Sequence, residues 1–343
     1  MSVDMNTLAA EIAAKIADYR TGEIIQPNRE HVLRWVGQFD APMQAELLVE
    51  TRHFLSRLYV SKTLIEQFII HLSTNVELTG GNPVTFWSGV GFLDLQYRSQ
   101  SQRDMLALLS DALHDRFSLN CDRRVSTNAR YIYIDDAIFT GNQVLSDLRR
   151  WIEHENISDC DVHLVFIGIH KSGFWYARKK LKQIVHSRNI RLHWWRMVEI
   201  EDWKKPENVA SVSVLWPTHA PDDKYVQRWL AACPDDRERF NPRPHPEQVV
   251  PNVNFASENG RELLEQAFLQ RGAYIASLPQ HGDPHMRPLG YHGLSGPGFG
   301  TLLSTYRNCP NNSPLVLWWG HPDAGHPLNQ WYPLLPRRTR AAN

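Results

Sequence analysis

The sequence of 343 residues is short of cysteine, and its four cysteines lie far apart. They form no Cys-x-x-Cys pair, and their density is well below that of a secreted domain stabilised by disulfides. No apolar stretch approaches the roughly 20 residues that a membrane-spanning helix requires. The first residues do not combine a basic segment with an apolar one, as a secretory signal does. These absences predict a cytoplasmic protein that does not interact with a membrane.

The chain also lacks an excess of charge, because Lys plus Arg and Asp plus Glu both number 37. This balance argues against a surface built as a whole to bind nucleic acid, since such affinity comes mainly from neutralising phosphates. Local basic patches remain, at residues 178–182 and 337–340. Clusters of this size are usually the solvated face of a helix or tail, and a local patch that binds nucleic acid is the alternative.

Apolar spacing and helix breakers divide the sequence into three parts. Residues 1–79 have apolar positions at helical spacing and predict an N-terminal helical region. Residues 80–218 alternate between segments typical of strands and segments with helical spacing. Strands are predicted at 90–95, 130–134, 162–169 and 190–198, and helices at 102–117, 141–153 and 174–186. Residues 219–343 are rich in proline and predict an extension that packs on the core, with helices at 224–233, 260–276 and 299–306 and a strand at 314–319. The alternation in the middle part predicts an α/β fold with a doubly wound parallel sheet, whose ligands bind at the carboxyl ends of its strands.

The stretch YIYIDDAIFTGNQ at residues 131–143 carries the clearest functional pattern. A short apolar strand leads to Asp135 and Asp136, and Thr140 and Gly141 precede a helix. A hydroxyl, backbone amides and the positive end of a helix dipole are what a phosphomonoester needs, and glycine lets the backbone approach it closely. Carboxylates at a strand end accept hydrogen bonds from ribose hydroxyls. The alternative is structural, with Asp135 starting a loop and Asp136 capping the helix.

This pattern resembles the ribose-phosphate signature of phosphoribosyltransferases. Longer stretches are similar, in the same order, to the phosphoribosyltransferase-like family of bacterial conflict systems (PRTase-CE), which includes accessory proteins of anti-phage retrons. The stretches are FWSGVGFLDLQYRSQSQRDMLALL, IYIDDAIFTGNQVLSDLRRWI, LHWWR, VLWPT and FGTLLSTYRNCPNNSPLVLWWG. The resemblance covers residues 29–336 and implies a phosphoribosyltransferase-like sheet of type I with an α/β C-terminal extension. It also implies an effector of an anti-phage defence system.

The resemblance implies roles for particular residues. Asp135 and Asp136 would face the ribose hydroxyls, and the phosphate would be held by Ala137, Phe139, Thr140, Gly141, Asn142 and Gln143. Gln143 departs from the family pattern, which has threonine at that position, and this departure puts catalysis in question.

Five further residues are assigned from their order along the chain. Arg98 and Ser99 take the place of a pyrophosphate loop, with Arg98 facing the leaving group, and Arg124 takes the place of a mobile catalytic loop. His170 and Lys171 follow the third predicted strand, where they would contact the pyrophosphate or the base. Each position also has a structural interpretation, as a polar turn, a solvated loop or a buried histidine.

The implied substrate is phosphoribosyl pyrophosphate or a nucleotide, with Mg²⁺ bound through its phosphates and reaction at C1 of the ribose. We expect no metal held by the protein alone, because the histidines and aspartates at 281–285 and 321–326 match no zinc spacing. An alternative of another class is a non-catalytic nucleotide-sensing or scaffolding subunit. The implied partners are a reverse transcriptase with its RNA–DNA hybrid and a winged-helix protein, and an oligomer is compatible with the sequence.

Overall fold

The structure is a computed structural model that describes residues 4–96, 100–120, 129–233, 240–245, 252–279, 283, 285–291 and 296–337. The chain divides into two compact units, the first formed by Met1–Ser61 with Trp203–Asn343 and the second by Lys62–Asp202. This division differs from the three parts expected from the sequence, because the C-terminal extension packs with the N-terminal helices in one unit. Helix-breaking residues in a sequence indicate where helices and strands end, but they do not indicate which helices and strands pack together. None of the described helices is long and apolar enough to cross a membrane.

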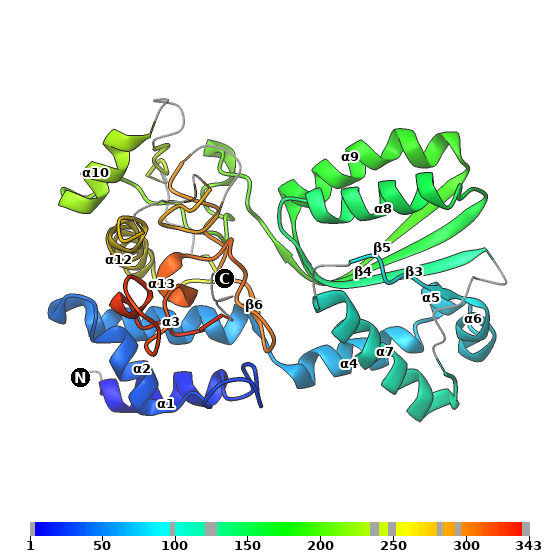
Figure 1. The fold of residues 1–343 in the computed structure, drawn as a ribbon, viewed down its shortest axis with the longest axis horizontal. Coiled ribbons are helices and arrows are strands. Elements are labelled where there is room, and N and C mark those ends of the chain that lie inside the picture. The colour runs from blue at the N-terminus through cyan, green and yellow to red at the C-terminus, as the bar shows by residue number, and fades with distance from the viewer. Residues whose placement is uncertain are drawn as a thin grey trace. The chain divides into compact units, whose positions relative to one another are not determined.

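Unit 2 is built around a parallel sheet, whose described strands lie in the order β2-β3-β4-β5 (Figure 1). These strands are β2 (Gly91–Phe92), β3 (Arg130–Ile138), β4 (Cys160–His170) and β5 (Ile190–Ile200). Strand β4 is apolar on both faces and buried along almost its whole length, as a strand covered on both sides should be. The predicted α/β fold with a parallel sheet is confirmed.

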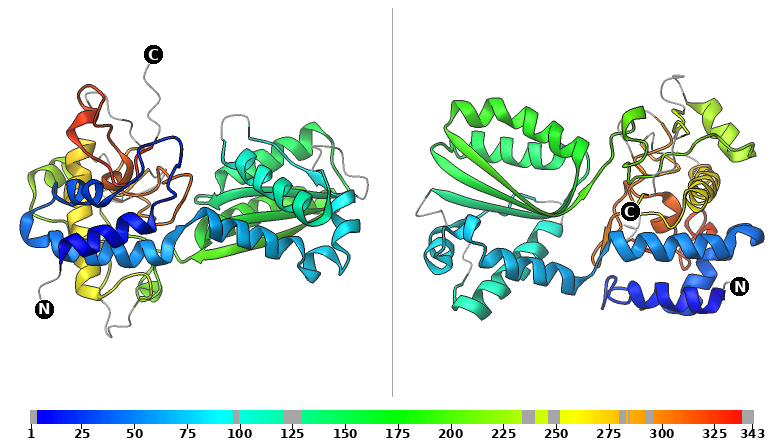
Figure 2. Two further views of the ribbon diagram at one scale, coloured as in Figure 1. Left: turned by 90° about the horizontal axis from the view of Figure 1, so that it is seen from below. Right: turned by 180° about the vertical axis from the view of Figure 1, so that it is seen from behind.

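Helices cover both faces of this sheet (Figures 1 and 2). Helices α8 (Asn142–His154) and α9 (Lys171–Ser187) lie on one face, and α4 (Lys62–Ser73) and α7 (Ser101–Phe117) lie on the other. The short helices α5 (Val76–Thr79) and α6 (Pro83–Gly89) precede β2. The apolar residues of α8 recur at helical spacing, so that one side of the helix packs into the core formed with β3 and β4.

Unit 1 joins helices from the two ends of the chain. Its N-terminal elements are α1 (Met5–Lys15), α2 (Arg29–Val36), η1 (Ala41–Met43), α3 (Gln44–Leu58) and β1 (Tyr59–Val60). Its C-terminal elements are η2 (Pro206–Asn208), α10 (Lys224–Ala232), α12 (Glu258–Ala276), β6 (Ser304–Thr305), α13 (Leu315–Trp318) and η3 (Leu328–Gln330). Strands β1 and β6 pair in parallel, and Glu50 of α3 accepts hydrogen bonds from Ala256 N and Ser257 N just before α12.

Two predicted elements of the C-terminal extension are wrong. The predicted helix at 299–306 is an extended segment that contains β6, because Gly298 and Gly300 adopt φ of 137° and 82°, and Ser304 pairs with Tyr59. The predicted strand at 314–319 contains the single helical turn α13 instead. All four of its residues are apolar, three of them are buried and Trp318 is partly buried. Such a short, continuous apolar run has no periodicity that separates a strand from a helix.

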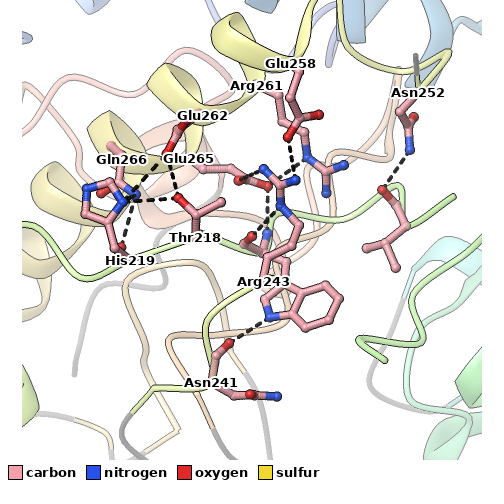
Figure 3. Close-up of polar contacts among 12 residues, drawn as sticks. Thr218, His219, Asn241, Arg243, Asn252, Glu258, Arg261, Glu262, Glu265 and Gln266 are labelled. Carbon is pink, nitrogen blue, oxygen red and sulfur yellow. Dashed lines mark hydrogen bonds and ion pairs between the residues drawn. The ribbon is translucent and has the colours of Figure 1, made fainter. Parts of the chain in front are cut away.

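A buried cluster of charged side chains packs along α12 (Figure 3). Glu265 Oε2 accepts a hydrogen bond from Arg243 Nη2 at 3.2 Å, and Glu265 Oε1 accepts from Arg261 Nε at 3.0 Å and from Trp216 N at 2.9 Å. Arg243 also pairs with Glu258. The side chains of Arg243 and Glu265 are fully buried, so this cluster connects Trp216 and Arg243 to α12.

Candidate functional site

The turn between β3 and α8 is formed by Phe139, Thr140 and Gly141. It lies at the edge of the sheet where the carboxyl ends of the parallel strands meet, since Ile138 pairs with Ile169 and His170 pairs with Ile200. Gly141, with φ of 78°, is the N-cap residue of α8. No side chain in the described part of the chain caps this helix, so the amides of its first turn face the edge without a side-chain acceptor.

The neighbouring helix α9 begins at the same edge of the sheet, but a carboxylate of the protein already occupies its N-terminus. Asp202, which follows β5, accepts hydrogen bonds from both the backbone N and the Oγ of Ser172, and its Oδ1 lies 2.8 Å from Ser172 N. Lys171 Nζ forms an ion pair with Glu201 Oε2 at 3.1 Å. The protein thus supplies its own carboxylate to the N-terminus of α9, whereas no described residue supplies one to the N-terminus of α8.

The turn packs tightly against the first residues of α9. A Cβ atom placed on Gly141 would lie 2.2 Å from the carbonyl oxygen of Gly173, and one placed on Gly173 would lie 1.9 Å from the carbonyl oxygen of Phe139. Two glycines therefore bring the backbone of the turn into contact with the backbone of α9. This contact fixes the direction in which the amides of the turn point.

Asp135 and Asp136 lie within β3 and not after it, because the strand continues to Ile138, four residues beyond its predicted end at residue 134. Consecutive side chains of a strand point to opposite faces of the sheet. Asp135 is buried and only 5% exposed, whereas Asp136 is partly exposed. The structure therefore separates the two carboxylates, which the resemblance had placed together against the ribose.

The carboxylate of Asp135 accepts hydrogen bonds from both Gln96 and Ser101. Its Oδ2 accepts a short hydrogen bond from Gln96 Nε2, and its Oδ1 accepts from Ser101 Oγ at 2.8 Å and from Asp136 N at 2.8 Å. The side-chain oxygen of Gln102 in turn accepts from the backbone N of Gln96 at 3.1 Å. Asp135 thus connects the end of the β2 segment and the start of α7 to strand β3, which is a positioning role.

Gln143 does not point its amide toward the turn. Its Nε2 donates to both carboxylate oxygens of Asp147, one helical turn further along α8, at 2.8 and 2.9 Å. Asp147 Oδ2 also accepts from Tyr133 OH at 3.0 Å, and Tyr133 OH accepts from Gln96 Nε2 at 2.9 Å. Gln143, the residue that replaces the threonine of the family pattern, is itself exposed, and its amide is bonded to the buried Asp147 of this hydrogen-bond network.

The sequence did not indicate Gln96, Ser101, Tyr133 or Asp147 as parts of this network. One signal was available for Tyr133 and Asp135, because polar residues two positions apart share one face of a strand. Asp147 had no such signal, since its partners are distant in sequence and only the packing of α8 on β3 brings them together.

The other candidate residues lie in different surroundings. His170 is completely buried, its Nδ1 lies 2.9 Å from the carbonyl oxygen of Ile138, and its ring packs against Phe139. Lys171 pairs with Glu201 as described above. Asn142 is exposed, and Thr140 and Ala137 are partly exposed at the turn. Arg98, Ser99 and Arg124 lie outside the described residues, so their predicted roles stay predictions.

Burial shifts the acidity of the groups in the site. Loss of solvent and the neighbouring Asp136 carboxylate raise the pKa of Asp135 to about 7. Burial also raises the pKa of Asp147 and lowers the pKa of His170 to about 4. His170 is therefore neutral near pH 7, and Asp135 is largely protonated below it.

We expect the raised pKa of Asp135 to appear in the stability of unit 2. The folded state binds a proton at Asp135 between its unfolded pKa of 3.8 and about 7, so this contribution to stability is present at low pH and is lost as the pH rises through that window. The free energy of unfolding of the wild type, minus that of Asp135→Asn, should fall by at most about 1.4 kcal/mol per pH unit. Urea unfolding at several pH values across the window measures this difference.

A second variant controls for general effects of pH. The pKa of Asp161 is lowered by its hydrogen bond with Arg191, so the stability that Asp161 contributes is fully present throughout the window and is lost only at lower pH. The free energy of unfolding of the wild type, minus that of Asp161→Asn, should therefore stay constant within the window. The contribution of the buried histidines to the pH dependence of stability cancels in both differences, because the wild type and both variants retain them. A flat difference for Asp135→Asn as well would mean that Asp135 is ionised in the folded protein.

Comparison with models of protein families connects this geometry to a known family. The PRTase-CE model matches residues 32–337, which is most of the chain and includes the whole of unit 2. The chain belongs to the PRTase-CE family. A comparison with curated proteins finds no match.

Membership of the PRTase-CE family agrees with the parallel α/β sheet and with the turn that follows two acidic residues. The family match extends through both units, so the helices of unit 1 belong to the family pattern as well as the sheet. In this PRTase-CE chain Asp136 is partly exposed, while Asp135 and Gln143 form hydrogen bonds with other side chains of unit 2.

Proposed function

We propose that this PRTase-CE protein binds a ribose 5-phosphate compound, either phosphoribosyl pyrophosphate or a nucleotide, at the turn 139–141 and acts at C1 of the ribose. The observation that carries the proposal is the contrast between two helices at one sheet edge. The N-terminus of α9 is capped by Asp202, whereas that of α8 has no side-chain cap among the described residues and follows Thr140 and Gly141. An uncapped helix N-terminus with a nearby hydroxyl is suited to a phosphate.

The proposed chemistry needs positioning more than a nucleophile. The first amides of α8 and the hydroxyl of Thr140 hold the 5′-phosphate, and Asp136 accepts hydrogen bonds from a ribose hydroxyl. Breaking the bond at C1 develops positive charge on the ribose, which a fixed carboxylate stabilises electrostatically.

The oxygen atoms at this site are also suited to Mg²⁺, the cation that the resemblance implies. Mg²⁺ prefers oxygen ligands, and it is usually held by one or two carboxylates together with substrate phosphates. Asp136 fits this chemistry, because it is the carboxylate of the Asp135–Asp136 pair that is partly exposed. Bound there, the ion would neutralise charge on a pyrophosphate leaving group.

The family name supports a wider proposal about biological role. We propose that the protein is an effector of an anti-phage defence system of the retron type, which consumes or modifies a nucleotide pool. A reverse transcriptase with its RNA–DNA hybrid, or a winged-helix protein, would then control it.

Replacing Thr140 with aspartate is expected to abolish binding of ribose 5-phosphate compounds. The change removes a hydroxyl donor and places a carboxylate against the phosphate, where two like charges repel each other. Isothermal titration calorimetry with phosphoribosyl pyrophosphate and ATP measures the loss. Thr63→Asp, an exposed position in the first turn of α4, makes the same chemical change elsewhere in unit 2 and should bind normally. Undiminished binding by Thr140→Asp would remove the phosphate assignment.

A second function, nucleotide sensing without turnover, is favoured by one observation. Gln143 stands where the family has threonine, and its amide is bonded to Asp147, so the turn lacks one hydroxyl donor for the phosphate. Incubation with phosphoribosyl pyrophosphate, ATP and NAD, followed by mass spectrometry of the products, separates the two functions. Turnover that disappears in Asp136→Asn supports an enzyme. Binding without products, together with turnover gained in Gln143→Thr, supports a sensor.

A further inference from the structure

A long segment around α9 carries positive charge only. Residues 162–198 contain no aspartate or glutamate, although the chain as a whole has equal numbers of acidic and basic residues. The basic residues of this segment are Lys171, Arg178, Lys179, Lys180, Lys182, Arg188, Arg191 and Arg196. The charge balance of the whole chain thus conceals a strongly basic region.

Part of this charge is neutralised within unit 2. Arg191 pairs with Asp161, Arg196 pairs with Glu199 and Lys171 pairs with Glu201. The four basic residues in the middle of α9 are different. Arg178, Lys179, Lys180 and Lys182 are exposed, and none forms an ion pair within the part of the chain that the structure describes.

An exposed tryptophan lies among these charges. Trp175 is 50% exposed, and Lys179 Nζ lies 4.6 Å from the centre of its ring. Trp175, Arg178, Lys179 and Lys182 follow one another at helical spacing, so they share one side of α9, and we call them the α9 basic face. The opposite side of the helix is buried through Gly173, Ala177 and Leu181, and within unit 2 the helix forms the outer layer over the sheet (Figures 1 and 2).

We propose that the α9 basic face binds single-stranded nucleic acid. Its unpaired ammonium and guanidinium groups match a row of phosphates, because phosphate neutralisation with release of counterions is the main source of such affinity. The indole of Trp175 offers a surface on which an unpaired base can stack. Since Lys179 Nζ lies over one face of that indole, a base stacks on the other face, and the phosphate of that nucleotide lies near a cation.

Two other partners with negative charge fit the face less well. A helix that binds a membrane surface inserts an apolar side into the lipid, but the apolar side of α9 is buried against the sheet and only Trp175 projects outward. An acidic protein would need an apolar centre for the interface, and the face offers one aromatic ring among cations. Duplex nucleic acid satisfies the charges, but it presents no unpaired base to the indole.

The test is fluorescence anisotropy of a labelled oligothymidylate titrated with the full-length protein at several salt concentrations. If the three cations of the face and the adjacent Lys180 each neutralise a phosphate, the logarithm of affinity should fall against the logarithm of salt with a slope of about −2.8. The triple variant Arg178→Gln, Lys179→Gln, Lys182→Gln should reduce that slope by about 2 and weaken binding about 100-fold at 0.1 M salt. Trp175→Ala should weaken binding at least about fivefold and leave the slope unchanged.

A matched control has the same change in net charge. Arg29→Gln, Arg52→Gln and Lys62→Gln remove three exposed cations that are paired with Glu30, Glu11 and Glu66, and they should leave binding within a factor of two or so. Equal weakening in this control would overturn the proposal, as would no binding by the wild type at low salt. Tighter binding to duplex DNA, or to phosphatidylserine vesicles, would assign the face to that partner instead. Thr140→Asp should bind oligothymidylate normally, so failure of the ribose-phosphate site leaves this result unaffected.

Discussion

Replacing Gly141 with alanine is expected to destabilise unit 2 by about 3 kcal/mol or more and to abolish binding of ribose 5-phosphate compounds. Two costs combine at this position. Its φ of 78° is unfavourable for any residue with a Cβ, and that Cβ would lie 2.2 Å from the carbonyl oxygen of Gly173. Because the obstacle is backbone and not the end of a flexible side chain, the turn itself has to move. Urea unfolding and calorimetric titration with phosphoribosyl pyrophosphate measure the two effects.

Gly81 offers a close control for this prediction. It lies in the same unit and has φ of 82°, but a Cβ placed on it would meet no atom within 4 Å. Gly81→Ala should therefore show only the conformational cost, about 1 kcal/mol, with normal binding. If the two variants lose equal stability, the contact between the turn and α9 is not rigid. If Gly141→Ala still binds at wild-type affinity, the turn is not the phosphate site.

The sheet and helices of unit 2 could be predicted from the sequence because local patterns specify them. Strand β4 is an apolar run of the length of a strand, and α7, α8 and α9 have apolar residues at helical spacing with clear ends. The end of β3 was less clear, since two aspartates disfavour a strand interior. Pairing with β4 overrides that preference, because Asp135 and Ala137 pair with Phe166 and Gly168 in the sheet.

The error at the end of β3 affected the site more than the fold. With both aspartates in a loop, each can turn toward a ligand, whereas in a strand they alternate and only one can. The sequence therefore indicated the location of the site, namely the turn after β3, but not the division of roles between Asp135 and Asp136. That division depends on Gln96, Ser101 and Tyr133, and only the folded sheet brings their side chains to the buried carboxylate.

The organisation of unit 1 was also beyond local patterns. Glu50 and Ala256 are about 200 residues apart and are joined by a hydrogen bond, and no periodicity in either segment indicates the other. Buried charges show the same limit, because in a sequence Arg243 and Glu265 look like ordinary surface residues. Their burial follows from packing between distant segments, and it makes unit 1 sensitive to single changes.

Replacing Glu265 with glutamine is expected to cost unit 1 about 3–5 kcal/mol of stability. The carboxylate forms ion pairs with two buried guanidinium groups, those of Arg243 and Arg261, at 3.2 and 3.0 Å. Arg261 Nη2 is buried without a hydrogen-bond acceptor even in the wild type, so its guanidinium depends on Glu265 and on the ring of Phe255, which lies 4.5 Å below it. An uncharged amide leaves excess positive charge in a region that water does not reach.

The neighbouring Glu262 on α12 allows a matched control, because its side chain is 36% exposed. Glu262→Gln retains an acceptor for Thr218 Oγ1 and should change stability by less than about 0.5 kcal/mol. A variant that replaces Arg243 and Arg261 with methionine and Glu265 with leucine should be more stable than Glu265→Gln, since it removes the charges together. The free energies of chemical unfolding of the three variants distinguish unpaired buried charge from disturbed packing. If the triple variant is no more stable than Glu265→Gln, the loss comes from disturbed packing and not from unpaired buried charge.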